Sequence, residues 1–207
     1  MMTETLRIAV LLSGGGRTLQ NFIDSRATGA LPVEIPLVIA SRAGLGGTDR
    51  ATAAGLRTEI ADRREFTSLH AFSQRVFALC DEAGADLICL AGWLALLQIP
   101  DRYNNRILNV HPALLPSFGG KGMYGHHVHQ AVIDHGCKVS GCTVHFCDNA
   151  YDTGPIVIQR TCPVFPDDTA DTLAARVFEQ ESIAYPEAVR LYSEKRLKIE
   201  GRKVRVL

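Results

Sequence analysis

The sequence predicts an α/β protein: a Rossmann-like, doubly wound mixed sheet, mostly parallel in the N-terminal half, with antiparallel strands in the C-terminal half. In the first half, short continuous apolar runs alternate with helix-like segments, which is typical of parallel strands covered on both faces. In the second half, two β-rich runs are joined by a connection too short for a crossover, which suits antiparallel neighbours.

The elements of the first half follow from this alternation. Continuous apolar runs predict strands over 6–12, 35–40, 56–60 and 86–91. Helical spacing of apolar residues predicts helices over 17–25, 48–54 and 68–83. A last run, 106–108, predicts a strand that ends where Asn109 begins. The first strand, the glycine turn after it and the first helix form a unit of the kind in which backbone N–H groups at the helix start hold a phosphate.

The second half has its own pattern. We expect a helix over 128–135, two antiparallel strands over 139–146 and 156–164, and a terminal hairpin over 197–207. Thr169 and the two aspartates before it predict the start of a long helix to about residue 195, which Pro186 should kink or interrupt. No linker or repeat is seen, so we expect a single domain over 1–207, with a phosphate-binding half (1–105) and a catalytic half (106–207).

Composition excludes several classes of protein. The 207 residues carry 22 basic and 22 acidic side chains, and this zero net charge argues against a nucleic-acid binder with a broad basic footprint. The six cysteines lie mostly in apolar runs, as reduced buried thiols do, and Cys137, Cys142 and Cys147 form no CxxC pair, so we expect no metal. The first apolar run is too short to span a membrane, and we expect a soluble cytoplasmic protein.

The glycine turn, residues 13–16, has three interpretations. A dinucleotide fingerprint needs a third glycine where Leu19 stands, although Ser41 and Arg42 keep a nicotinamide enzyme open. A purely structural tight turn also stays open. We favour a bound phosphate ester, because the strand-to-helix turn presents backbone N–H groups and Arg17 adds charge. The expected binding residues are Gly15, Gly16, Arg17 and Thr18.

The stretch NVHPALLPSFGGKGMYGHH, residues 109–127, carries the main chemical signal. Asn109 and His111 are two residues apart at a strand end, so they project from one face, and Pro112 keeps His111 out of the helical region. The other histidines lack this setting. His126, His127 and His129 suit a helix start with mixed exposure, and His145 is expected on the other face of the sheet.

The turn DNAYDTGP contains two carboxylates, Asp148 and Asp152, which also suit ordinary turn chemistry. We expect Asp152, beside the rigid Thr153-Gly154-Pro155 corner, to reach His111, orient its ring and raise its pKa. An amide, an imidazole and a carboxylate, with no GxSxG elbow, indicate acyl transfer in which the nucleophile belongs to the substrate. Asn109 and His111 would stabilise the oxyanion, and His111 would also shuttle the proton.

The sequence resembles the folate-dependent formyltransferases, and among them the phosphoribosylglycinamide (glycinamide ribonucleotide) formyltransferases. The resemblance covers nearly the whole chain, through VLLSGGGRTLQN, LAGWLALL, ILNVHPALLPSFGGKGMYG, VHFCDNAYDTGPIVIQ and ARVFEQESIAYPEAV. The NxHPxLLP loop is shared across the superfamily. GKGMYG and the lack of a second domain separate this chain from methionyl-tRNA formyltransferase, and no N-terminal regulatory domain precedes it as in formyltetrahydrofolate hydrolase.

The resemblance implies a formyltransferase fold and an activity in purine biosynthesis. The formyl group of 10-formyltetrahydrofolate would pass to the amine of glycinamide ribonucleotide, with no metal. By position, Asn109, His111 and Asp152 match the catalytic trio. Residues 16–18 match the phosphate site, and Glu181 matches a contact to the substrate's sugar or amine side. The folate pocket would comprise Leu94, Ala95, Leu96, Leu97 and Asn109, with the backbone of 148–152 meeting the pterin, which makes 106–207 the folate-binding half.

The sequence departs from the family pattern at a few positions. Members often carry arginine where Ala95 stands and polar residues where Gly15 and Arg17 stand. Leu69 replaces a basic residue that meets the folate's glutamate tail, which leaves Arg63, Arg64 or His70 as candidates for that contact. Two alternatives stay open: formyltetrahydrofolate hydrolysis, and a non-catalytic nucleotide-binding relative. The expected partners are the two small-molecule substrates, not nucleic acid or membrane, and a homodimer stays open.

Overall fold

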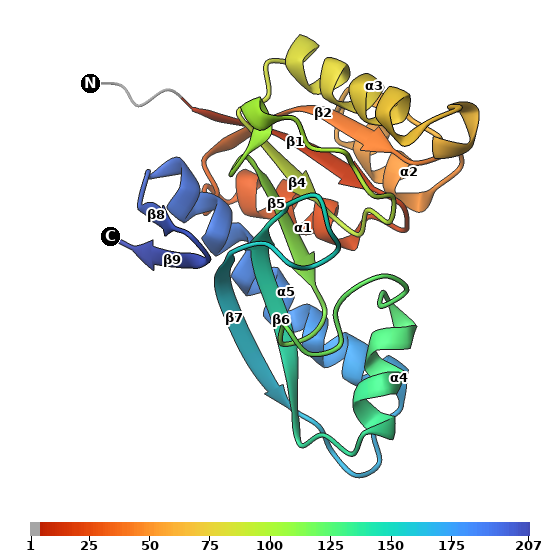
Figure 1. Cartoon of the computed structure of the whole chain (residues 1–207), viewed down its shortest axis with the longest axis vertical. Coiled ribbons are helices and arrows are strands. Elements are labelled where there is room, and N and C mark those ends of the chain that lie inside the picture. The colour runs from red at the N-terminus through yellow and green to blue at the C-terminus, as the bar shows by residue number, and fades with distance from the viewer. Residues whose placement is uncertain (1–4) are drawn as a thin grey trace. The chain divides into compact units, whose positions relative to one another are not determined.

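The computed structural model describes residues 5–207, which form nine strands and five α-helices (Figure 1). The chain divides into two compact units, with the division between Leu108 and Asn109. The first unit has parallel strand pairings and the second has mainly antiparallel ones, so the predicted mixed α/β fold is confirmed.

The strands of the first unit are β1 (Leu6–Leu12), β2 (Val33–Ala40), β3 (Thr58–Ile60) and β4 (Leu87–Leu90). They lie in the order β3-β2-β1-β4, and each pairing is parallel. Residues 8–12 of β1 are fully buried, as a central strand covered on both faces requires. The four strands predicted here are confirmed, with ends that differ by up to two residues.

Three helices connect these strands: α1 (Arg17–Ala27), α2 (Gly46–Ala53) and α3 (Leu69–Glu82), with a 3₁₀ turn at Arg63–Glu65 and another at Asp101–Tyr103. The connections from β1 to β2 and from β2 to β3 run one way along the sheet, and the connection from β3 to β4 runs back past β1. Because such crossovers are right-handed, α1 and α2 cover one face and α3 the other. The carboxyl ends of β1 and β4 thus flank a topological switch point, where doubly wound sheets bind ligands.

The strand β5 (Ile107–His111) begins in the first unit and ends in the second. The second unit continues with α4 (His126–Asp134), β6 (Val139–Phe146), β7 (Ile156–Pro163), α5 (Ala170–Ser193), β8 (Leu197–Glu200) and β9 (Lys203–Val206). The pairing of β6 with β7 is antiparallel, as predicted, and β9 lies between β7 and β8. Apolar residues of α5, among them Leu173, Val177 and Tyr185, are buried, and the helix contacts β6, β7 and α4.

Two predictions about element ends are wrong. The strand predicted to end at Asn109 continues to His111, because Pro112 holds His111 in an extended backbone. Pro186 does not interrupt α5, which runs unbroken from Ala170 to Ser193. The neighbours Tyr185, Ala188 and Val189 are fully buried, and their packing outweighs the one backbone hydrogen bond that proline removes.

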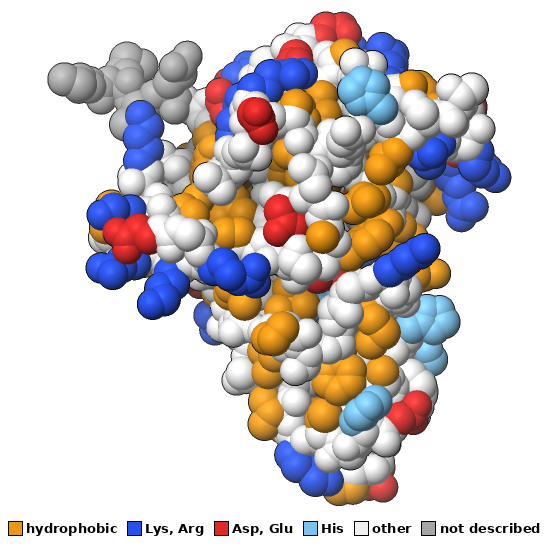
Figure 2. Space-filling model, viewed as in Figure 1, with side chains coloured by type: hydrophobic (Ala, Val, Ile, Leu, Met, Phe, Trp, Pro, Cys, Tyr) orange, Lys and Arg blue, Asp and Glu red, His pale blue; other side chains and the backbone are white. Residues whose placement is uncertain are grey.

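The terminal hairpin of β8 and β9 turns at Gly201, as predicted. Its edge carries paired charges: Glu200 accepts from Lys198 at 2.9 Å and from Arg205 at 3.0 Å. At the left of Figure 2, in the place of the hairpin in Figure 1, blue and red side chains lie together. Charged side chains on an edge strand oppose pairing with other chains.

Candidate active site

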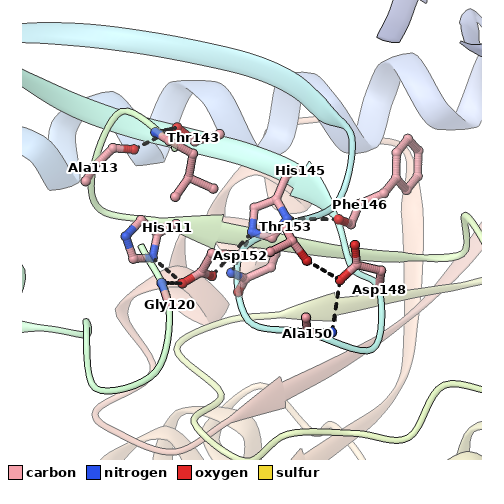
Figure 3. Close-up of polar contacts among 12 residues, drawn as sticks. His111, Ala113, Gly120, Thr143, His145, Phe146, Asp148, Ala150, Asp152 and Thr153 are labelled. Atoms are coloured by element: carbon pink, nitrogen blue, oxygen red, sulfur yellow. Dashed lines mark hydrogen bonds and ion pairs between the residues drawn. The ribbon is translucent and has the colours of Figure 1, made fainter. Parts of the chain in front are cut away.

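The strand β5 places two polar side chains on one face, as their spacing predicts. Asn109 is half-buried, and His111 is only 3% exposed. Each side chain is in contact with a polar group of the second unit: Asn109 with His145, and His111 with Asp152 (Figure 3). We call these four residues, Asn109, His111, His145 and Asp152, the His111 cluster.

The loop after β5 returns to hold the ring of His111. Its Nε2 lies 2.8 Å from the carbonyl oxygen of Phe118, and its Nδ1 lies 3.5 Å from Oδ2 of Asp152. The backbone N–H of Gly120 donates to the same Oδ2 at 2.8 Å. A Cβ on Gly119 would stand 2.5 Å from Cδ2 of Leu115 and 3.3 Å from Cβ of Asp152, so the small residue lets the loop pass close to the carboxylate.

The turn between β6 and β7 presents Asp152. The residue has a left-handed backbone (φ 59°), and its side chain is 11% exposed. Two residues on, a Cβ on Gly154 would stand 1.8 Å from the carbonyl oxygen of Phe146, so this corner admits only glycine. Asp148 instead accepts hydrogen bonds from the Ala150 N–H and the Thr153 hydroxyl, at 3.0 and 2.6 Å, and serves the turn itself. Of the two carboxylates, Asp152 makes the contact with His111.

His145 is in the cluster, although we expected it on the other face of the sheet. Its Nε2 lies 3.1 Å from Nδ2 of Asn109 and 3.6 Å from Oδ1 of Asp152. The pairing of β6 with β7 shifts between Val144 and His145, but the extra residue, Val157, lies on β7, so β6 keeps its own alternation. Every residue of β6 after Val139 is buried. Both faces of the strand are therefore covered, and burial does not distinguish the face that meets the cluster.

Thr143, two residues before His145, ties β6 to the returning loop. Its hydroxyl donates to the carbonyl of Ala113 at 2.7 Å, and it accepts from the N–H of Leu115 at 3.0 Å and from Nε2 of Gln159 at 3.0 Å. The spacing of Thr143 and His145 was the one sequence signal that these side chains share a face.

Opposing effects act on the pKa of the His111 ring. Burial lowers its pKa, while the charge of Asp152 and the Phe118 carbonyl act to raise that pKa and His145 lowers it further. Asp152 thus acts in the expected direction, but the net shift of the pKa is downward, because desolvation outweighs the carboxylate. Both ring nitrogens nevertheless face oxygen acceptors, and only the doubly protonated ring satisfies both. The ring therefore suits a group that gains and loses a proton.

Asp152 stays ionised beside this ring. Burial acts to raise its pKa, but the neighbouring ring of His145, the charge of His111 and the Gly120 N–H together hold that pKa below its usual value. The carboxylate is thus a fixed negative charge that favours the protonated form of His111.

The glycine turn of the first unit is open to a ligand. Gly14, Gly15 and Arg17 are exposed, and Gly16 begins α1 with no capping side chain and no acidic residue in the first turn. Gly16 has a φ of 74°, and a Cβ there would stand 2.6 Å from Cα of Gly47. No atom lies within 4 Å of a Cβ placed on Gly15, so a polar side chain would fit at this position.

Arg50 is a further residue at this turn that the sequence did not reveal. Its Nε donates to the carbonyl of Gly15 at 2.9 Å, and its Nη1 donates to Gln20 at 3.2 Å. The guanidinium therefore holds one peptide of the glycine turn and adds a positive charge to that of Arg17.

The predicted folate segment, 94–97, follows β4 at the same switch point. Ser13 joins it to the glycine turn: its N–H donates to Gly92 at 3.1 Å, and its hydroxyl accepts from the N–H of Leu94 at 3.2 Å. Leu94 is exposed, Ala95 and Leu96 are half-buried and Leu97 is buried. Leu94 is thus an exposed apolar side chain beside the turn, suited to contact a ligand ring.

Three basic residues were candidates for a folate tail. Arg64 forms a bidentate pair with Asp62, and Arg63 donates to the carbonyl of Phe66 at 2.8 Å. His70 contacts Gln98 at 3.2 Å, directly after the folate segment. Of the three, His70 is the one whose contact lies next to that segment.

Glu181 belongs to α5 in the second unit. Its negative charge acts on Cys142 of β6, whose pKa burial and this charge raise to about 12. All six cysteines are free thiols, and Cys80 and Cys142 have pKa values raised to about 12, mainly by burial. Among residues 5–207 no cluster of three histidine, cysteine or carboxylate side chains is suited to a metal ion. None of the helices in this range has the length and apolar character needed to cross a bilayer.

On this α/β fold a half-buried amide contacts one imidazole, and a carboxylate lies beside that imidazole and a second one, an arrangement suited to a group-transfer enzyme. Residues 6–189 match the family described as formyl transferase. The chain therefore belongs to the formyl transferase family.

Individual relatives agree with this family. The chain is 39% identical to glycinamide ribonucleotide transformylase 1 from Symbiobacterium toebii, whose crystal structure superposes with a TM-score of 0.93 over 100% of both chains. It is 35% identical to phosphoribosylglycinamide formyltransferase of Haemophilus influenzae, over 94% of this chain and 90% of that protein. It is 38% identical to trifunctional purine biosynthetic protein adenosine-3 of Gallus gallus, over 92% of this chain but only 19% of that longer protein.

Proposed function

We propose that this protein transfers the formyl group of 10-formyltetrahydrofolate to the amine of glycinamide ribonucleotide, giving formylglycinamide ribonucleotide and tetrahydrofolate in purine biosynthesis. The observation that carries the proposal is the position of His111, 2.8 Å from the Phe118 carbonyl and 3.5 Å from Asp152, on a strand shared with Asn109. Membership of the formyl transferase family supports the choice of group, and the name of the Haemophilus influenzae relative, phosphoribosylglycinamide formyltransferase, supports the choice of acceptor.

The reaction needs no nucleophile from the protein. The substrate amine forms a bond to the formyl carbon, and the bond from that carbon to the folate nitrogen then breaks. The amine loses a proton and the folate nitrogen gains one, and His111 carries it between them. An N–H of Asn109 stabilises the oxyanion of the tetrahedral intermediate, with about 3–4 kcal/mol for each good donor. The second donor is Nε2–H of the protonated His111 ring, which exchanges the Phe118 carbonyl for the oxyanion, while Nδ1–H stays toward Asp152.

Asp152 supports this step from behind the ring. Its carboxylate, held by the N–H of Gly120 at 2.8 Å, favours the protonated ring of His111 against the cost of burial. Burial and the carboxylate thus act on the ring in opposite directions, so neither protonation state is favoured by both, which suits a proton shuttle.

The ribonucleotide phosphate binds at the glycine turn. The backbone N–H groups of Gly15, Gly16, Arg17 and Thr18 and the positive end of α1 attract the anion, and Arg17 adds a charged donor. Glu181 supplies a carboxylate for the sugar or amine side of the same substrate. The nicotinamide alternative is less well supported, because β2 ends at Ala40 without an acidic residue for a ribose.

The folate binds along residues 94–97, with Asn109 at the reacting end and the backbone of 148–152 against the pterin. Exposed Leu94 offers apolar contact. Leu69 stands where family members carry a basic residue for the glutamate tail of the folate. Our candidate for that contact is His70, whose Nδ1 contacts Gln98 directly after this segment. We place the enzyme in the cytoplasm, where its six free thiols would stay reduced.

Product analysis separates this function from hydrolysis of the formyl folate. The enzyme is incubated with 10-formyltetrahydrofolate with and without glycinamide ribonucleotide, and formate and formylglycinamide ribonucleotide are measured. We expect the formylated ribonucleotide only when the acceptor is present, with little formate. Formate release at the same rate with and without the acceptor would overturn the proposal in favour of a hydrolase.

Separate titrations test for a non-catalytic relative. Calorimetry with glycinamide ribonucleotide and, in another experiment, with a non-reactive folate analogue should show one site for each. Binding of the ribonucleotide alone, without folate binding or turnover, would identify a nucleotide-binding protein that has kept the fold.

A further inference from the structure

His145 is the member of the His111 cluster that the proposed chemistry does not use. It lies on β6, is 2% exposed, and has a polar partner at each ring nitrogen. A buried imidazole with two such partners can hold another side chain in one orientation.

The partners fix which nitrogen of the neutral ring carries the proton. Nδ1 lies 2.9 Å from the carbonyl oxygen of Phe146, which can only accept, so Nδ1 donates. Nε2 of the neutral ring is then an acceptor, and the group within reach to donate to it is Nδ2 of Asn109, at 3.1 Å. A primary amide can be turned by half a rotation with little change in shape, so its orientation depends on such a partner.

We infer that His145 is a positioning residue: it holds the amide of Asn109 with Nδ2 toward the ring. One amide hydrogen then goes to His145, and the second stays available for the formyl oxygen. Without an acceptor at the Nε2 position, no other hydrogen bond found among residues 5–207 distinguishes the oxygen of this amide from its nitrogen. This inference rests on the proposed role of Asn109 as an oxyanion donor.

Two conservative variants each keep one of the ring's nitrogens. In His145→Asn, the amide nitrogen replaces Nδ1 and keeps the hydrogen bond to Phe146, but nothing reaches the Nε2 position. In His145→Gln, the longer side chain puts an acceptor oxygen near the Nε2 position and gives up the bond to Phe146. The two variants therefore separate positioning of Asn109 from support of the β6 backbone.

Steady-state formyl transfer to glycinamide ribonucleotide is measured for wild type, both variants, Asn109→Ala and the double variants. We expect His145→Asn to lower kcat about 10- to 100-fold with unchanged KM, part of what loss of an oxyanion donor costs, and His145→Gln to keep most of the rate. In the Asn109→Ala background His145→Asn should change kcat less than about threefold, because no amide remains to be positioned.

The opposite pattern would overturn the inference. An active His145→Asn with an impaired His145→Gln would assign the ring to the Phe146 carbonyl, and additive losses with Asn109→Ala would assign it an independent role. Ser140→Ala is the matched control on the same strand, since the Ser140 hydroxyl is buried without a hydrogen-bond partner among the described residues. It should leave kcat unchanged. Failure of the proposed function is distinguishable, because wild type itself would then not formylate the ribonucleotide.

Discussion

Nδ1 of His111 lies 3.5 Å from Oδ2 of Asp152, and both side chains are withdrawn from solvent. Burial lowers the pKa of the ring, while the carboxylate acts against this shift. The pair thus combines a low-dielectric site with one fixed charge. The effects expected of His111→Ala, of Asp152→Asn and of pH on stability follow from that combination.

His111→Ala should lower kcat by about 10³-fold or more, because it removes both an oxyanion donor and the proton shuttle. The affinity for glycinamide ribonucleotide, measured by calorimetry, should change little, because the phosphate is proposed to bind at the glycine turn. His127→Ala, at an exposed position near the start of α4, is the control and should retain wild-type rates. A weakened affinity with an unchanged kcat would contradict the proposed role of His111.

Asp152→Asn should move the inflection assigned to His111 in the kcat–pH profile to lower pH, as well as reduce the rate. The sign follows from the loss of a negative charge that raises the pKa of the ring. The profile is recorded from about pH 5 to pH 9. Asp148→Asn, whose carboxylate bonds within the turn, should leave the inflection in place. If only Asp148→Asn moved it, the role would belong to Asp148.

Gly16→Ala should raise the KM for glycinamide ribonucleotide about tenfold or more, because a positive φ and contact with Gly47 both oppose a side chain there. Gly15→Ala is the matched control. Its Cβ would lie in open space and the backbone N–H is kept, so KM should change less than about twofold. Equal effects of the two substitutions would argue that the shape of the turn does not govern phosphate binding.

Thr143→Val should lower the free energy of unfolding by about 2–4 kcal/mol, although the side chains have the same shape, because it leaves buried groups of Ala113 and Leu115 without their partner. Denaturant unfolding measures this change. Ser140→Ala on the same strand should be close to neutral, since its buried hydroxyl has no hydrogen-bond partner among the described residues. A loss of the same size in both variants would contradict the role assigned to the Thr143 hydroxyl.

The free energy of unfolding should fall as the pH falls below 6.5, the ordinary pKa of histidine. The folded-state pKa of His111 is lowered, so in this window the unfolded chain binds more protons, and the stability present above 6.5 is lost on acidification. Asp152, whose pKa is also lowered, adds a second loss below 3.8. Denaturant titrations of wild type and His111→Asn should show a shallower fall for the variant between pH 6.5 and pH 5. Parallel curves would contradict a lowered pKa of His111.

Local patterns in the sequence were sufficient for most of the fold. Continuous apolar runs predicted β1, β2 and β4, and Thr169 predicted the start of α5, because strand burial and helix capping depend on neighbouring residues. The two-residue spacing of Asn109 and His111 predicted that they share a face, since the period of an extended strand is a property of the backbone itself.

Only the tertiary structure decided what surrounds these side chains. The place of His145 depends on what covers each face of β6, and because the strand is buried on both faces no local signal distinguishes them. The direction of the His111 pKa shift depends on how far the returning loop excludes water, and Pro186 is tolerated because distant residues pack around its helix. Burial and strand pairing are both set by contacts between residues that are far apart in the chain. The sequence by itself therefore determined which polar groups stand at the end of β5 and in the turn after β6, and the folded chain decided what each of them contacts.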